Sequence, residues 1–128
     1  MSEDPLMILV IDDDTSYCAI MKEFLSRDGF EVYLAYDVPH AQRLLKIFIP
    51  DLILADIMMP DIDGLWLIRD LRSQPIFADI PTIVVSARTL PEERTAAKEA
   101  GADAFVAKPF SFDNLRTMIH SFLPSGVG

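Results

Sequence analysis

The sequence has one cysteine, no long hydrophobic run and few basic residues. Cys18 alone can form no intramolecular disulfide and no cysteine-rich zinc site, and its place in a helical pattern favours packing over reactivity. The longest apolar run, residues 6–11, is too short to cross a bilayer, and no basic segment precedes it. We therefore expect a soluble, cytoplasmic protein without a membrane partner.

Basic side chains number 11 against 20 acidic ones, which gives a net charge of −9. Such a chain repels nucleic-acid phosphates, so we expect no direct nucleic-acid partner. The acids are unevenly spread, because Asp12, Asp13 and Asp14 adjoin one another and a second group lies between residues 56 and 63. Clustered aspartates beside apolar runs require an explanation other than a solvated helix face.

Two hydrophobic periodicities alternate along the chain. Apolar runs of strand length predict strands at residues 6–11, 30–35, 52–55, 82–85 and 104–107. Helical spacing and capping residues predict helices over about 17–28, 38–48, 65–72, 91–100 and 112–122. The first of these carries Tyr17, Ile20, Met21, Phe24 and Leu25 at helical spacing.

Five βα units without a repeat or a linker predict one three-layer α/β domain. The apolar first, third and fourth strands fit a parallel sheet that is buried on both faces. The expected fold is a flavodoxin-like (βα)5 domain with strand order 2-1-3-4-5, which places the second strand, with its Glu31, at an edge. We assign residues 1–124 to this domain and 125–128 to a tail or the start of a linker.

The helix predicted over residues 91–100 differs from the others because its only apolar side chains are alanines. At roughly 25 cal/mol per Å² of buried surface, alanines anchor a helix far less firmly than larger side chains do. We infer that this helix is the element most able to shift.

Polar side chains follow the predicted strands where each one ends. Asp12 and Asp13 follow the first strand, Asp56 the third, Ser86 ends the fourth and Lys108 follows the fifth. Carboxyl ends of parallel strands meet at one edge of a sheet, where ligands of such folds bind. These five side chains are therefore expected to line one pocket.

Three carboxylates in one pocket repel each other by about 4 kcal/mol per pair at about 4 Å and an effective dielectric near 20. Either their pKa values rise or a cation neutralises them. Oxygen ligands without His or Cys select a hard cation such as Mg²⁺, which suits phosphoryl chemistry. Lys108 and Ser86 can bind further phosphoryl oxygens, and a carboxylate can act as nucleophile.

Four segments in this order resemble the receiver domains of bacterial response regulators. They are Ile11-Asp12-Asp13, Leu54-Ala55-Asp56-Ile57-Met58-Met59-Pro60 with Asp63-Gly64, Val85-Ser86-Ala87 and Lys108-Pro109-Phe110. The resemblance extends from Leu6 to about Leu123. It implies a phosphorelay signalling domain that promotes only its own phosphorylation and dephosphorylation, rather than an enzyme with a turnover substrate.

The resemblance also implies a role for each matching position. Asp56 is the expected phosphoacceptor, and Ser86 and Lys108 the groups that contact the phosphoryl oxygens. Mg²⁺, or Mn²⁺ in its place, is expected to bind Asp12, Asp13, Asp56 and the main-chain carbonyl of Met58, Asp12 through water. The Lys108–Pro109 bond is expected to be cis, and Phe105 to be the aromatic whose rotamer follows Ser86, through packing alone because it lacks a hydroxyl.

The implied phosphodonor is a phosphohistidine on a sensor histidine kinase or a phosphotransfer protein. The helix at 91–100, the last strand and the last helix form the implied signalling surface for a downstream protein or a second copy of the chain. Met58 and Arg88 occupy positions at which the family varies and tunes phosphoryl lifetime.

Simpler interpretations exist for several residues. Asp14 is better explained as a helix cap than as a metal ligand, Asp12 and Asp13 can also be helix-start acids, and Lys108 can be an ordinary surface lysine. His40 and His120 are expected at the surface. The 61–64 segment fits neither a calcium loop nor an aspartyl phosphatase motif, because its spacing is wrong for both.

Two alternative functions also remain for the whole domain. One is an unphosphorylated scaffold with the same fold, against which the complete acid, hydroxyl and lysine set argues. The other is a flavin or nucleotide carrier, which needs a Gly-rich or Ser/Thr-rich loop after the first strand where this chain has three acids.

Overall fold

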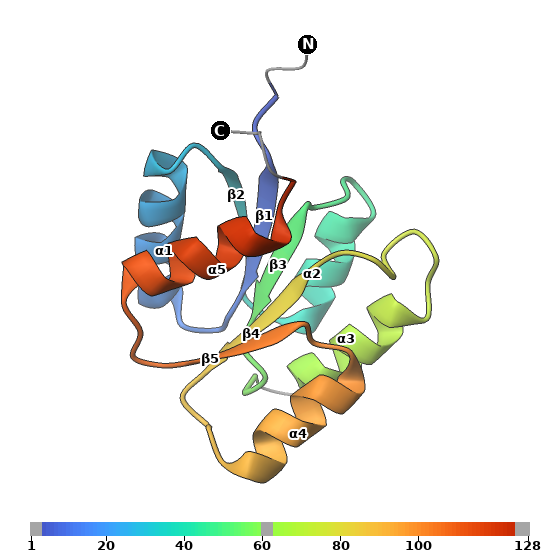
Figure 1. Cartoon of the computed structure of the whole chain (residues 1–128). Helices are drawn as coiled ribbons and strands as arrows, with labels where there is room; N and C mark the ends of the chain where they lie inside the picture. Colours follow the sequence, from blue (N-terminus) through green and yellow to red (C-terminus); the bar gives the residue numbers. More distant parts are fainter. Residues whose placement is uncertain (1–3, 60–62, 125–128) are drawn as a thin grey trace.

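The computed structural model describes residues 4–59 and 63–124, in which strands and helices alternate. The elements are β1 (Met7–Ile11), α1 (Thr15–Arg27), β2 (Glu31–Ala35), α2 (Val38–Leu45), β3 (Leu52–Ala55), α3 (Gly64–Arg72), β4 (Thr82–Ser86), α4 (Pro91–Ala100), β5 (Ala104–Ala107) and α5 (Phe112–Phe122). All strand pairs are parallel in the order β2-β1-β3-β4-β5 (Figure 1), which confirms the predicted flavodoxin-like topology.

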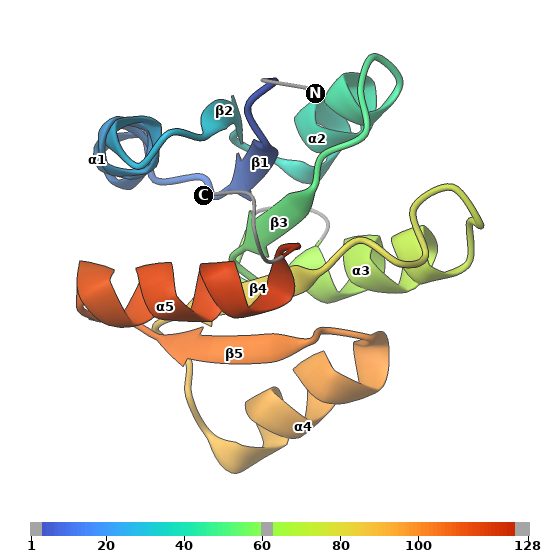
Figure 2. The ribbon, with the colours of Figure 1, turned by 45° about the horizontal axis from the view of Figure 1, so that its top comes forward.

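The sheet is buried on both faces in its centre. Every residue of β3 and β4 is buried, whereas β2 and β5 form the two edges and are partly exposed. Helices α1 and α5 cover one face, and α2, α3 and α4 cover the other (Figure 2). No helix among the described residues is long and apolar enough to span a membrane.

Short polar side chains fix where most helices begin. The N-cap side chains of Asp14, Asp37, Asp63 and Ser111 each accept a hydrogen bond from the amide three residues later. Such a bond satisfies one of the amides that a helix start leaves without an intrahelical partner. The predicted cap at Asp14 is therefore confirmed.

One predicted helix end is wrong. Helix α2 ends at Leu45, and Phe48 lies beyond the turn that follows, where its ring packs on Tyr33 at a centroid distance of 4.3 Å. Pro50 keeps the helix from continuing through Ile49, because the residue before a proline disfavours helical geometry. In α1 the buried positions include Cys18, while Ile20 is 54% exposed.

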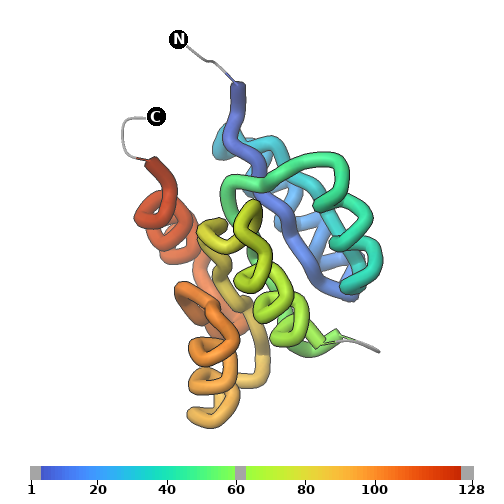
Figure 3. The backbone as a smooth tube through the Cα atoms, turned by 90° about the vertical axis from the view of Figure 1, so that its right-hand side faces the viewer, coloured from blue at the N-terminus to red at the C-terminus, as the bar shows by residue number. Residues whose placement is uncertain are grey.

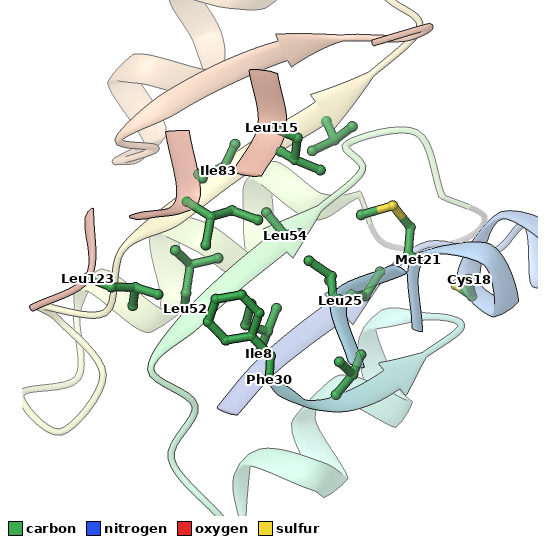
Figure 4. Close-up of a cluster of buried hydrophobic side chains, with 14 residues drawn as sticks. Ile8, Cys18, Met21, Leu25, Phe30, Leu52, Leu54, Ile83, Leu115 and Leu123 are labelled. Atoms are coloured by element: carbon green, nitrogen blue, oxygen red, sulfur yellow. The ribbon is translucent and has the colours of Figure 1, made fainter. Parts of the chain in front are cut away.

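The largest buried cluster lies between the sheet and the α1/α5 layer. Figure 4 shows side chains from α1, such as Met21 and Leu25, meeting Leu115 of α5 over the strand residues Leu52 and Leu54. A second cluster joins α2 and α3 to the opposite face, and a smaller third one includes α4. The strands thus hold a rigid frame from which their carboxyl ends project.

Helix α4 has the shallowest anchoring, as predicted, since its buried residues are two alanines, Ala97 and Ala100. It lies beside α3 (Figure 3), and Arg72 of α3 links the two. The Arg72 guanidinium donates to the carbonyls of Gly101 and Ile80 at 3.0 and 2.9 Å and pairs with the Asp103 carboxylate at 2.9 Å. The carboxyl end of α4 is therefore better held than its composition suggested.

Candidate functional site

Backbone hydrogen bonds carry the sheet pairing one residue past the ends of the strands. The Asp12 amide donates to the Ala35 carbonyl at 3.0 Å, and the Asp56 amide donates to the Ile11 carbonyl at 2.9 Å. Across the sheet, the Lys108 amide donates to the Ser86 carbonyl at 2.9 Å. The main chain at these predicted site residues is thus set by the register of the sheet.

The ammonium group of Lys108 lies between two carboxylates. Its Nζ is 2.7 Å from Asp12 Oδ2 and 3.3 Å from Asp56 Oδ2. The two oxygens are therefore no further apart than the sum of these distances, about 6 Å. Strands β1, β3 and β5 thus bring together three of the residues that the sequence had placed in one pocket.

Burial acts in opposite directions on the two members of the shorter ion pair. Asp12 is only 2% exposed, and this burial raises its pKa, although hydrogen bonds from Lys108 and the Asp14 amide partly offset the effect. Burial alone lowers the pKa of Lys108, but the hydrogen bond and charge of Asp12, together with Asp56, outweigh it and raise the pKa overall. Lys108 is therefore charged at neutral pH. The penalty for burying the pair shows in Asp12, whose pKa is raised.

The Asp56 carboxylate is held at both oxygens. Its Oδ1 accepts a 2.9 Å hydrogen bond from the Met58 amide, and its Oδ2 faces Lys108. Helix α3 begins against the main chain of this residue, since a Cβ on Gly64 would lie 2.4 Å from the Asp56 carbonyl oxygen. Glycine is consequently required at position 64 for this approach.

A cleft of about 570 Å³ opens beside the buried carboxylates. It is lined by Asp13, Ile57, Met58, Met59, Asp63, Leu65, Arg88, Glu92, Glu93 and Ala96. Asp13 is exposed and faces this cleft rather than Lys108, so the two adjacent aspartates have different surroundings. Arg88 and Glu93 form a 2.8 Å ion pair that ties the loop after β4 to the first turn of α4.

Ser86 and Phe105 lie on the neighbouring strands β4 and β5 and are not among the residues that line this cleft. The Ser86 hydroxyl is fully buried and accepts a 3.1 Å hydrogen bond from the Arg88 amide, which leaves its own proton to donate. Phe105 is half-buried, pairs in register with Val84, and has the Arg94 guanidinium 4.7 Å from its ring centroid. The proposed response of Phe105 to Ser86 stays a prediction.

The response regulator receiver domain model matches residues 8–120, most of the chain. The chain belongs to this family. As a receiver domain of two-component response regulators, it is a signalling phosphoacceptor domain. This membership confirms the resemblance that its four sequence segments had indicated.

Known proteins similar to this receiver domain agree with the assignment. It is 40% identical to PetR of Rhodobacter capsulatus over 96% of this chain and 51% of PetR, and 39% identical to the response regulator MprA of Mycolicibacterium vanbaalenii over 93% and 51%. The receiver domain of the Pseudomonas aeruginosa sensor histidine kinase PA1611 superposes with a TM-score of 0.85 at 27% identity, covering 93% of this chain and 98% of that one. The chain spans about half the length of the curated relatives it matches.

The structure also shows the state of the Lys108–Pro109 bond, the single cysteine and the two histidines of this receiver domain. The Lys108–Pro109 peptide bond is cis, as expected. Cys18 is buried, its thiol donates to the Asp12 carbonyl, and burial raises its pKa to about 12, so it packs as predicted. His120 is exposed and contacts the Asp28 carboxylate at 3.1 Å, while His40 is half-buried. Residues 60–62 and 125–128, which carry part of the turn motif and the tail, lie outside the described residues.

Tyr17 is the main contact of the receiver site that sequence reasoning missed. Its ring centroid lies 4.0 Å from Lys108 Nζ. The helical pattern identified Tyr17 only as an apolar position of the first helix. The available signal was its position on the first turn of the helix that directly follows the acidic cluster, which places an aromatic ring next to the strand ends.

Proposed function

We propose that this receiver domain accepts a phosphoryl group on Asp56 from a phosphohistidine of a sensor histidine kinase or phosphotransfer protein. The observation that carries the proposal is the Asp56 carboxylate, held between the Met58 amide and the Lys108 ammonium at the ends of β3 and β5. A carboxylate oxygen attacks phosphorus and forms an acyl phosphate. The phosphorus–nitrogen bond of the donor breaks, and its electron pair goes to the imidazole ring. We also propose a cytoplasmic location, as expected from the sequence.

Lys108 and Ser86 supply the oxygen-binding groups. The transferred phosphoryl group brings negative charge into a site that already holds the buried Asp12, and the ammonium compensates for part of that charge. The free proton of the Ser86 hydroxyl can bond a phosphoryl oxygen while the hydroxyl still accepts from Arg88. These groups act only on the domain's own Asp56, so the domain promotes its own phosphorylation and dephosphorylation.

The donor set fits a divalent cation. Asp12, Asp13, Asp56 and the Met58 carbonyl offer oxygen ligands alone, and Lys108 offsets only part of the charge of Asp12 and Asp56. Asp13 and Met58 line the cleft beside this ion pair. Among residues 4–59 and 63–124, no three His, Cys, Asp or Glu side chains stand close enough to form a metal-binding group. We therefore propose that the Met58 carbonyl and water complete the set, with Asp12 acting through water. Mg²⁺, or Mn²⁺, would neutralise phosphoryl oxygens there. The receiver domain of PA1611 has a magnesium ion coordinated in its active-site cleft.

The proposed signalling surface consists of α4, β5 and α5. Helix α4 is anchored by two small side chains, and β5 is an edge strand whose residues are all partly exposed. The loop after Ser86 connects the site to α4 through the Arg88–Glu93 ion pair. A shift of Ser86 toward a phosphoryl group would thereby bias the position of α4 and the surface for a downstream protein or a second copy.

The test is phosphorylation by a small phosphodonor such as phosphoramidate, followed by intact-protein mass spectrometry. Wild-type protein with Mg²⁺ or Mn²⁺ should gain one phosphoryl group, and a chelator should prevent the gain. Asp56→Asn should gain none. Asp14→Asn is the matched control, because asparagine also caps a helix, and it should behave as wild type.

An adduct that persists in Asp56→Asn would place the acceptor elsewhere. A wild-type protein that takes up no phosphoryl group and gives no binding signal in a Mg²⁺ titration would favour the unphosphorylated scaffold.

A further inference from the structure

The Lys108 ammonium touches an aromatic face as well as two carboxylates. The ring of Tyr17 lies 4.0 Å from Nζ, within the range of a cation–π interaction. We propose that Tyr17 is a positioning residue that holds Lys108 against Asp56 for phosphoryl acceptance. The inference rests on the proposed function of Asp56.

The main chain of Tyr17 is fixed by the start of α1. Its amide donates to the capping carboxylate of Asp14 at 3.0 Å, which fixes the position from which the side chain projects. Burial raises the pKa of the Tyr17 phenol, with the charges of Asp12 and Asp56 adding to the effect, so the side chain stays neutral beside the ammonium. A neutral ring thus presents its electron-rich face to Lys108.

A column of aromatic rings supports Tyr17 from behind. Phe110 packs edge-on against it at 6.5 Å between centroids, and Phe112 packs edge-on against Phe110 at 5.6 Å. Phe112 in turn stacks on Phe24 of α1 at 4.0 Å. The column joins α1 to the segment that follows Lys108, so the ring cannot withdraw from Lys108 without disturbing the packing between α1 and α5.

Phosphoryl acceptance leaves two contacts of the Lys108 ammonium chemically unchanged, those with the Tyr17 ring and with the Asp12 carboxylate. Attack on the donor converts the Asp56 carboxylate into an acyl phosphate, so the partner of Lys108 changes from a carboxylate oxygen to a phosphoryl oxygen. Because Asp12 holds the ammonium at one oxygen only, a lysine on a flexible four-carbon stem needs another constraint to follow that change without turning to solvent. Tyr17 supplies it from a position outside the reacting atoms.

The experiment compares Tyr17→Phe, Tyr17→Leu and the matched control Phe24→Leu. Phe24→Leu removes a ring from the same helix and the same column but leaves the contact between Tyr17 and Lys108 in place, since Phe24 stacks on Phe112. The initial rate of phosphorylation by phosphoramidate with Mg²⁺ is measured for each folded variant. Tyr17→Leu should lose about fivefold, the factor that corresponds to about 1 kcal/mol. Tyr17→Phe and Phe24→Leu should stay within about twofold of wild type.

A spectroscopic measurement tests the contact independently of phosphorylation. The ε-methylene proton signals of Lys108 should be shifted upfield by the ring in wild type and Tyr17→Phe, and should lose that shift in Tyr17→Leu. Unmoved signals in Tyr17→Leu, or equal rate losses in Tyr17→Leu and Phe24→Leu, would overturn the positioning role alone. A wild-type protein that takes up no phosphoryl group would overturn the proposed function and this role with it.

Discussion

Replacing Lys108 with methionine should destabilise the domain measurably in the absence of divalent cations. The substitution keeps much of the side-chain volume but leaves two buried carboxylates without their shared cation. With oxygens at most about 6 Å apart, their mutual repulsion is roughly 3 kcal/mol at an effective dielectric of about 20. Removing one partner of a buried ion pair costs about 3–5 kcal/mol, and partial exposure of Lys108 reduces this. We expect a loss of about 2–3 kcal/mol.

Urea and thermal unfolding at pH 7 with a chelator measure this loss. A midpoint about 10 °C below wild type is expected for a domain of this size. Lys22→Met is the control, because Lys22 is exposed on α1, and it should change the free energy of unfolding by less than about 0.5 kcal/mol. The cost of Lys108→Met should fall below about 1 kcal/mol in an Asp12→Asn background, where only one carboxylate remains.

The loss should depend on pH in a defined direction. As the pH falls toward the raised pKa of Asp12, protonation removes one of the two charges, so the difference between Lys108→Met and wild type should shrink. The stabilisation from the raised pKa of Lys108 is present at neutral pH and disappears as the pH rises past that pKa, above the ordinary 10.5. The reasoning is refuted by wild-type stability in Lys108→Met, or by a cost that Asp12→Asn leaves unchanged.

Three further outcomes follow from the packing. The Cys18 thiol should resist iodoacetamide in the native protein and react on unfolding, as followed by mass spectrometry; alkylation at the rate of a free thiol would contradict its burial and its pKa of about 12. Gly64→Ala should lower the free energy of unfolding in urea by more than about 2 kcal/mol and slow phosphorylation of Asp56. Gly29→Ala, at φ +94° in open space, should cost only about 1 kcal/mol. Equal costs would refute the close approach of α3 to the Asp56 carbonyl. Arg72→Met should lower the free energy of unfolding by about 1–2 kcal/mol and increase hydrogen exchange at the carboxyl end of α4. Unchanged exchange would show that contacts other than those of Arg72 hold this end.

The sequence was sufficient for the fold and for the convergence of Asp12, Asp56 and Lys108. Apolar run lengths located the ends of the strands, and parallel topology places those ends at one edge. A continuous pairing of the strands then positions the residues that follow, as the amide bonds of Asp12 and Asp56 show. This part of the prediction depends on backbone regularity alone.

Side-chain partners across the domain were harder to predict. Asp12 and Asp13 are equivalent neighbours in the sequence, yet one is buried against Lys108 and the other faces the open cleft. The difference depends on the residue at which β1 ends and on the direction of its last side chains. Tyr17 and Arg72 have partners 91 and 29 positions away, which are set by how α1, α3 and α4 settle on the sheet.

The ion pair between Lys108 and Asp12 joins residues 96 positions apart in the chain. During synthesis Asp12 and Asp56 are made long before Lys108. The first strands therefore emerge from the ribosome without the positive charge that pairs with these two carboxylates. A fragment that ends before Lys108 therefore holds Asp12 and Asp56 without the ammonium group that pairs with both. If Asp56 is the acceptor as proposed, the domain should become able to receive a phosphoryl group only after β5 and Lys108 have been synthesised.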